Sequence, residues 1–146
     1  NLYIAGLLHD IGKIILMEKA SARYLGVLKK AAAEGRPDLE VEQQELGFTH
    51  ADVGSVLAIK WFLPEDLAIA IRYHHRPSAD PFHRSLSSLI HVADQLAWNA
   101  GNPSTVGTHL APLDPDTYRQ IELDAAAVAA LLPNVREDFA ASELPW

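Results

Sequence analysis

The 146-residue chain contains no cysteine. This absence excludes disulfides, thiolate zinc sites and cysteine nucleophiles. A metal ion would have to be held by histidine and carboxylate side chains, so the seven histidines are the residues to explain. For such a ligand set we expect a divalent metal, either as one ion or as a dinuclear centre. Iron, manganese or magnesium is expected rather than zinc.

Long apolar runs and a surplus of basic residues are also missing. The longest apolar candidate, Leu2–Met17, is interrupted by His9, Asp10 and Lys13, and no run reaches the roughly 18 residues that span a bilayer. Acidic residues outnumber basic ones by 19 to 12, for a net charge of -7, with no basic stripe. We therefore expect no nucleic-acid partner, no membrane association and no signal peptide, and a cytoplasmic location.

What is present favours one all-α globular domain. Hydrophobic residues make up 49% of the chain, which is enough for a sizeable core. Apolar residues recur with helical spacing, and no segment alternates as a strand does. The first residue is Asn1 rather than Met, and the helical pattern is already running at Leu2. We therefore expect this chain to be a fragment of something longer.

The helices are predicted from apolar periodicity and from caps and breakers. Thr49 is expected to cap one helix, with Asp52 at its third position, and Pro64 is expected at the first position of the next. Pro133 is expected to end the Ala-rich helix before a last short one. The predicted helices are Leu2–Met17, Ser21–Glu34, Asp38–Leu46, 50–62, 64–75, a segment through Leu86–Ala97 that ends at Gly101, and Ala125–Leu132. Residues 1–100 are interpreted as the core of the domain, truncated at its N-terminal side, and 101–146 as a C-terminal helical extension packed on it.

The first predicted helix carries an unusual polar stripe. At 100° per residue, His9 and Lys13 are about 40° apart, and Asp10 is about 60° beyond Lys13. Burying a carboxylate costs several kcal/mol unless it is paired or bound to a cation. Either Asp10 and Lys13 simply form an ion pair, or a functional site lies here.

Polar residues also face the predicted core elsewhere. His50 shares a helix face with apolar residues, His74 and His75 lie on or beside the next apolar stripe, and Asp94 lies at the edge of another. A single core histidine is more often structural, but four helices that each turn at least one His or Asp towards the core indicate a convergent metal site. Adjacent His9 and Asp10 can each bind one of two ions, or Asp10 can bridge them. The remaining histidines are weaker candidates: His83 and His109 are expected in solvated loops, and His91 on the outer side of its helix, at the surface or behind the ligands.

The order of several motifs resembles a known family. Ala5–Lys13 reads AGLLHDIGK, which is similar to the HD motif of metal-dependent phosphohydrolases, and Thr49–Gly54 reads THADVG. The segments IRYHHRP (Ile71–Pro77) and HVADQLA (His91–Ala97) follow. Together they resemble the HDOD domain of the HD superfamily, which is found in bacterial signal transduction, over about residues 1–100.

The resemblance implies an HD-domain-like helical bundle with the metal ligands His9, Asp10, His50, His74, His75 and Asp94. Asp10 and Lys13 would be the catalytic pair, with Lys13 near a phosphate group. HD-superfamily enzymes also use a histidine on a helix before the HD motif, and this chain does not include that position, which leaves open whether the intact protein has it. A second feature departs from active relatives: Arg76-Pro77 follows the double histidine where HD-GYP phosphodiesterases have a Glu and a GYP loop.

Three functions remain open. The leading hypothesis is a signal-transduction module that retains a metal centre and binds signalling protein domains or a phosphate-containing small ligand. The alternative is a metal-dependent phosphohydrolase that acts on a nucleotide or cyclic dinucleotide. The third is a structural interaction domain whose His and Asp residues only form internal hydrogen bonds.

Overall fold

The computed structural model describes residues 2–101, 113–114 and 116–142. Within these residues every regular element is helical and none is a strand, which confirms the all-α prediction. The elements are α1 (Leu2–Leu8), α2 (Ile11–Glu34), α3 (Asp38–Leu46), α4 (His50–Lys60), α5 (Glu65–Tyr73), the 3₁₀ turn η1 (Pro77–Ala79), α6 (Arg84–Asn99), α7 (Thr117–Gln120) and α8 (Ala125–Ala141).

The predicted continuous helix Leu2–Met17 is wrong, because His9 and Asp10 form a break between α1 and α2. The break lets the two helices reach different neighbours: α1 packs on α5 and α6, whereas α2 packs on α3 and α4. The gap predicted between Met17 and Ser21 corresponds to a kink at Ala20, whose φ and ψ of -140° and 37° are not helical. Two helical parts meet at this kink, and together they form α2, which ends at Glu34.

The caps of α3 and α4 agree with the sequence pattern. Gly47 ends α3 with a φ of 81°, which favours glycine. Thr49 and Asp52 form the expected capping box at the start of α4. Pro64, however, precedes α5 instead of being its first residue, and α5 ends at Tyr73. His74 and His75 therefore lie in the turn after the helix.

The C-terminal part differs from the prediction at Pro133. This residue lies inside α8, which runs on to Ala141. Proline removes one backbone donor and crowds the preceding turn, but here it does not end the helix. Most of the predicted 102–115 connection, including His109, lies outside the described residues. The division of the domain at residue 100 stays a prediction.

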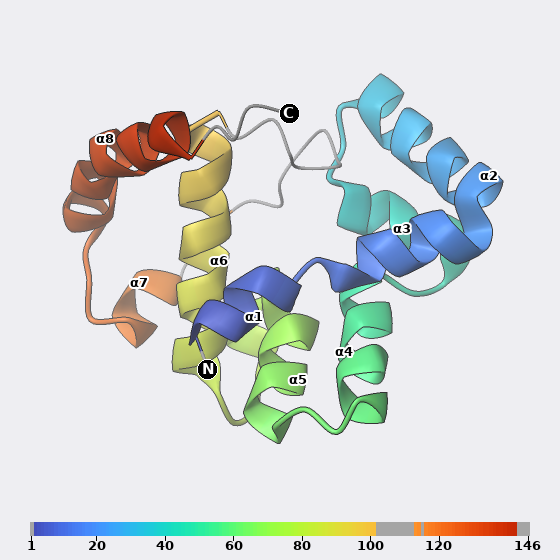
Figure 1. The fold of residues 1–146 in the computed structure, drawn as a ribbon, viewed down its shortest axis with the longest axis horizontal. Coiled ribbons are helices and arrows are strands. Elements are labelled where there is room, and N and C mark those ends of the chain that lie inside the picture. Colours follow the sequence, from blue (N-terminus) through green and yellow to red (C-terminus); the bar gives the residue numbers. More distant parts are fainter. Residues whose placement is uncertain (1, 102–112, 115, 143–146) are drawn as a thin grey trace.

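The helices pack in sequence across the molecule (Figure 1). Contacts run from α3 to α2, then to α4, α5 and α6, while α7 and α8 both lie against α6. Buried apolar residues form three small groups: between α2 and α3 around Tyr24, between α4 and α5 around Ile71, and between α1, α5 and α6 around Leu67. The segments that carry the candidate ligands meet between these groups.

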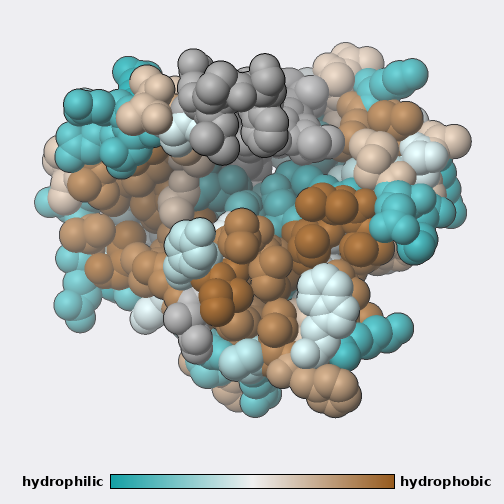
Figure 2. Space-filling view, in the orientation of Figure 1, coloured by the Kyte–Doolittle hydropathy of each residue, from teal (hydrophilic) through white to brown (hydrophobic). Residues whose placement is uncertain are grey.

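The surface of α1 is apolar and largely exposed. The helix reads LYIAGLL and contacts α5 and α6, but only Ala5 is buried, and Leu2, Tyr3, Ile4 and Leu7 are exposed. Figure 2 shows apolar side chains gathered at the centre of this face, where α1 lies. Among the described helices, none is both long and apolar enough to cross a membrane.

Candidate metal centre

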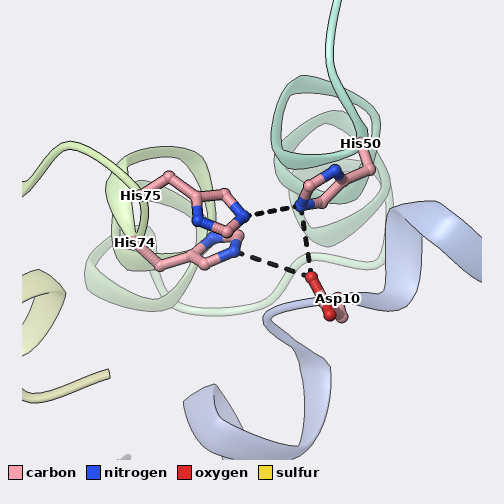
Figure 3. Close-up of side chains that lie close together, drawn as sticks. All are labelled: Asp10, His50, His74 and His75. Carbon is pink, nitrogen blue, oxygen red and sulfur yellow. Dashed lines mark hydrogen bonds and ion pairs between the residues drawn. The ribbon is translucent and has the colours of Figure 1, made fainter. Parts of the chain in front are cut away.

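Four side chains from three parts of the chain point toward one another (Figure 3). Asp10 comes from the break between α1 and α2, and His50 is the first residue of α4. His74 and His75 come from the turn after α5. Each offers one possible ligand atom, and these atoms all lie within 4.8 Å of one another. We call Asp10, His50, His74 and His75 the Asp–His site.

The separations in the Asp–His site suit a shared cation. His50 Nε2 lies 3.2 Å from Asp10 Oδ1 and 2.9 Å from His75 Nε2. His74 Nε2 lies 3.6 Å from the same Asp10 oxygen. Two atoms that bind one ion from about 2.1 Å, at a right or tetrahedral angle, are about 3.0–3.4 Å apart. The observed distances are close to that range.

Hydrogen bonds orient two of the imidazoles. His50 Nδ1 lies 2.7 Å from Glu42 Oε2, and His74 Nδ1 lies 2.7 Å from the Ile71 carbonyl oxygen. Because a carboxylate and a carbonyl only accept hydrogen bonds, each Nδ1 must carry the proton. In the neutral ring, Nε2 then carries a lone pair, and it is Nε2 that faces the site. This is the tautomer that a metal ligand requires.

Several polar atoms here are buried without a hydrogen-bond partner. They include Asp10 Oδ1 and His74 Nε2 in the Asp–His site, and His9 Nε2 beside it. Buried polar atoms are normally satisfied, so orphaned ones that face each other need an explanation. A divalent cation fits, because it accepts imidazole nitrogens and carboxylate oxygens together and these ligands include no sulfur.

The electrostatics favour the metal-binding form of two ligands. Burial opposes ionisation of Asp10, but His50, His74 and Lys13 outweigh it and hold the pKa of Asp10 well below its usual value. Burial and the neighbouring His74 and His50 lower the pKa of His75 well below its usual value. Asp10 is therefore charged and His75 neutral near neutral pH, as metal ligands must be.

The pKa values of His50 and His74 shift in opposite directions. For His50, burial lowers the pKa, but the neighbouring carboxylates of Asp10 and Glu42 outweigh it, and the net shift is upward. For His74, burial is the largest influence, and the pKa is lowered. A metal ion binds only a neutral imidazole, so it would compete with a proton for His50 Nε2.

The chain is similar to known proteins in sequence and in fold. A family model described as the HDOD domain matches residues 1–77, more than half of the chain. The chain belongs to the HDOD family. This agrees with the resemblance seen in its motifs.

Relatives of this HDOD chain are distant. An "Uncharacterized protein" from Treponema pallidum (strain Nichols) is 30% identical over 95 residues, which cover 63% of this chain and 18% of the relative. The structure of an HDOD domain protein of unknown function from Geobacter sulfurreducens matches with a TM-score of 0.82 and 22% identity, over 97% of this chain and 52% of that one. A "Putative phosphohydrolase" from Shewanella amazonensis SB2B matches with a TM-score of 0.65 and 19% identity, over 97% and 50%. The HDOD chain thus spans about half of each solved neighbour, and both confirm its helical fold.

The remaining predicted ligands lie beside the Asp–His site. His9 Nε2 lies 3.6 Å from Asp10 Oδ2 and 3.6 Å from Asp94 Oδ1. Burial lowers the pKa of His9, but Asp94 and Asp10 outweigh it, and the net shift is upward. Lys13 Nζ lies 2.8 Å from Asp10 Oδ2, so the expected ion pair forms. His9 and Asp94 therefore make a second group that shares Asp10 with the first.

The sequence did not single out Glu42 and Tyr24 as site residues. Both are fully buried, and the Tyr24 hydroxyl donates to Glu42, which contacts His50. Of the two positions expected for His91, the surface position is wrong, because the side chain is buried. The other is confirmed: His91 Nδ1 lies 2.7 Å from the carbonyl oxygen of His74, behind the ligands. His83 lies at the N-terminal end of α6 and is partly exposed.

Proposed function

We propose that this HDOD chain is a regulatory module of signal transduction that binds a divalent metal ion in the Asp–His site. The observation that carries the proposal is the convergence of one carboxylate and three buried imidazoles, among which Asp10 Oδ1 and His74 Nε2 have no hydrogen-bond partner. Iron, manganese or magnesium suits these ligands in the absence of thiolates. Ionised Asp10 supplies the negative charge.

A second ion would extend the same site. His9 and Asp94 would hold it together with Asp10, whose Oδ2 faces His9 and whose Oδ1 faces His50. In this dinuclear arrangement the adjacent residues His9 and Asp10 would supply ligands to both ions from a single turn of the chain.

The ligand or partner of the module would approach the same region. A divalent ion in the site would supply positive charge that attracts an anionic group. Lys13, whose side chain is 11% exposed, stands beside Asp10 and can donate to a phosphate oxygen. We therefore propose a phosphate-containing small ligand or a signalling protein domain as the partner, in the cytoplasm.

Phosphoester hydrolysis is the second candidate. It is favoured by Lys13 beside Asp10, since phosphoryl transfer needs a cation at the phosphate as well as a metal site. In this function Asp10 would help to hold the ions and Lys13 would stabilise a phosphoryl oxygen. The bound ion would supply Lewis-acid activation.

Calorimetric titration of the metal-free protein with Mn²⁺ tests the binding. We expect saturable binding by the native chain, and loss of binding in Asp10→Asn, which keeps the shape of the side chain but removes its charge. Asp116→Asn is the matched control, because Asp116 lies at the start of α7 and pairs with exposed Arg119. If native protein with native helical content binds no Mn²⁺ or Fe²⁺, the proposal is wrong.

A hydrolysis screen separates the two functions. The full-length protein, loaded with Mn²⁺ or Fe²⁺, would be tested on phosphomonoesters, nucleotides and cyclic dinucleotides. Activity that disappears in both Asp10→Asn and Lys13→Met would establish the enzyme. Metal binding without turnover would support the regulatory function.

A further inference from the structure

Glu42 is a fully buried carboxylate beside the Asp–His site that the preceding function does not use. It comes from α3, and its Oε2 accepts hydrogen bonds from the His50 backbone N–H at 2.8 Å and from His50 Nδ1 at 2.7 Å. Its Oε1 accepts a hydrogen bond from the Tyr24 hydroxyl at 2.8 Å. The carboxylate thus accepts hydrogen bonds from one candidate ligand, His50, and from one supporting residue, Tyr24.

Such a buried charge is costly unless its partners compensate for it. Here the compensation comes from the backbone N–H and Nδ1 of His50 and from the Tyr24 hydroxyl, all within 2.8 Å of the carboxylate oxygens. An apolar residue could fill the same space between α3 and α4 without this cost. Packing alone therefore does not explain why a carboxylate occupies this position.

The geometry at His50 indicates what the carboxylate does. With its Nδ1 proton held by Glu42, the imidazole presents the Nε2 lone pair to Asp10 and His75. A carboxylate behind a histidine also makes the opposite nitrogen a stronger electron donor. His74 has only the neutral Ile71 carbonyl in the equivalent position. The two histidines therefore differ in donor strength.

We infer that Glu42, supported by Tyr24, is a positioning residue of the Asp–His site: it fixes His50 as the Nδ1–H tautomer and increases the donor strength of its Nε2. The tautomer part stands on the contacts above, and the metal-affinity part rests on the proposed function. Tyr24 acts one step further away, because its hydroxyl fixes the orientation of the carboxylate.

The competing explanation is that Glu42 only anchors α3 to the start of α4. Both explanations predict that a large truncation destabilises the chain, so stability cannot separate them. The tautomer of His50 and the affinity of the chain for Mn²⁺ can separate them. Glu42→Gln keeps the volume and one acceptor but removes the charge, and its amide can either accept from Nδ1 or donate to it.

The first readout is nitrogen NMR of the metal-free protein with isotopically labelled histidine, at a pH where His50 is neutral. In the native chain we expect His50 signals of the Nδ1–H tautomer, and in Glu42→Gln a shift toward a mixture of tautomers. Native signals of the Nε2–H form would overturn the inference. Because this experiment needs no metal, it remains decisive if the proposed function fails.

The second readout is Mn²⁺ affinity by calorimetry. Loss of a hydrogen-bonded carboxylate behind a ligand histidine typically weakens binding about 10- to 100-fold, and we expect a loss of this size in Glu42→Gln. Tyr24→Phe should give a smaller loss in the same direction, and it keeps the test available if Glu42→Gln does not fold. Glu45→Gln is the matched control, since it removes an exposed carboxylate on the same helix that pairs with Lys30.

The outcomes separate the two claims. Native binding of Mn²⁺ with equal affinity in Glu42→Gln and Glu45→Gln, and unchanged His50 signals, would overturn the inference and leave the proposed function intact. An absence of Mn²⁺ binding in the native chain would overturn the proposed function. The tautomer measurement would then still decide what Glu42 does.

Discussion

At the scale of single residues, the Tyr24 hydroxyl links the stability of the chain to pH. The side chain is fully buried and donates to Glu42. Burial and the negative charge of Glu42 raise the pKa of Tyr24 far above its usual value. The unfolded chain can therefore ionise at this position under alkaline conditions where the folded chain cannot.

This difference predicts a loss of stability in base. The contribution is fully present below the ordinary tyrosine pKa of about 10 and is lost as pH rises above it, because only the unfolded state ionises there. At about pH 11 the native chain should have lost about 1 kcal/mol more than Tyr24→Phe, relative to neutral pH. Urea unfolding of both proteins across this range measures it. Parallel curves would contradict the assigned burial and bonding of the hydroxyl.

The candidate ligands could be predicted from the sequence, but the residue that orients His50 could not. His9 and Asp10 stand out because they interrupt an apolar segment, and His50, His74, His75 and Asp94 because they lie on apolar faces. Glu42 does not stand out: α3 also carries Asp38, Glu40 and Glu45, and only the packing of α3 against α2 decides which carboxylates are buried. Local pattern identifies the unusual residue, whereas its partner depends on tertiary contacts.

At the scale of elements, the crossing of α2 and α4 brings Asp10 close to His50. Gly12 makes the crossing possible: a Cβ added there would overlap the His50 carbonyl oxygen and lie 2.9 Å from the Gly54 backbone nitrogen. At Gly54 a Cβ would lie 2.9 Å from Ile71 Cγ2. Gly12 therefore permits the close approach of the α2 and α4 backbones beside the ligands, and Gly54 leaves room for the Ile71 side chain.

Two glycines of α2 should respond to alanine in opposite ways. Gly12→Ala should destabilise the chain by about 3 kcal/mol, because the backbone that the new methyl group would overlap cannot move aside. Gly26→Ala meets nothing within 4 Å. It should stabilise the chain by about 0.5–1 kcal/mol, because alanine has the higher helix propensity.

Chemical denaturation of the two variants measures both effects. The pair is matched, since the same methyl group is added to the same helix. If Gly12→Ala were as stable as Gly26→Ala, the close approach of α2 to α4 would be wrong.

Helix ends with strong local signals were predictable, and those set by packing were not. The Thr49–Asp52 capping box and the turn at Gly47 are written in a few adjacent residues. The break at His9–Asp10 has no proline and no local pattern marked it, whereas the kink at Ala20 lies in the gap predicted between Met17 and Ser21. Pro133 shows the converse, since a strong local breaker lies inside α8.

At the scale of the whole molecule, the Asp–His site exists only because distant segments are brought together. Asp10, His50 and the His74–His75 turn belong to elements that pack as α2 on α4 and α4 on α5. The family resemblance could supply this arrangement in advance, while periodicity alone could place each residue only on its own helix. The exposed apolar surface of α1 shows that apolar composition alone does not decide burial either.

The most direct test of the metal centre is thermal unfolding of the metal-free chain with and without Mn²⁺. An ion that binds only the folded state stabilises it by about 2.7 kcal/mol at about a hundred times its dissociation constant. We predict that Mn²⁺ raises the Tm of the native chain and of Asp116→Asn, but not that of Asp10→Asn. An unchanged Tm of the native chain, or an equal rise in Asp10→Asn, would contradict a metal centre at Asp10, His50, His74 and His75.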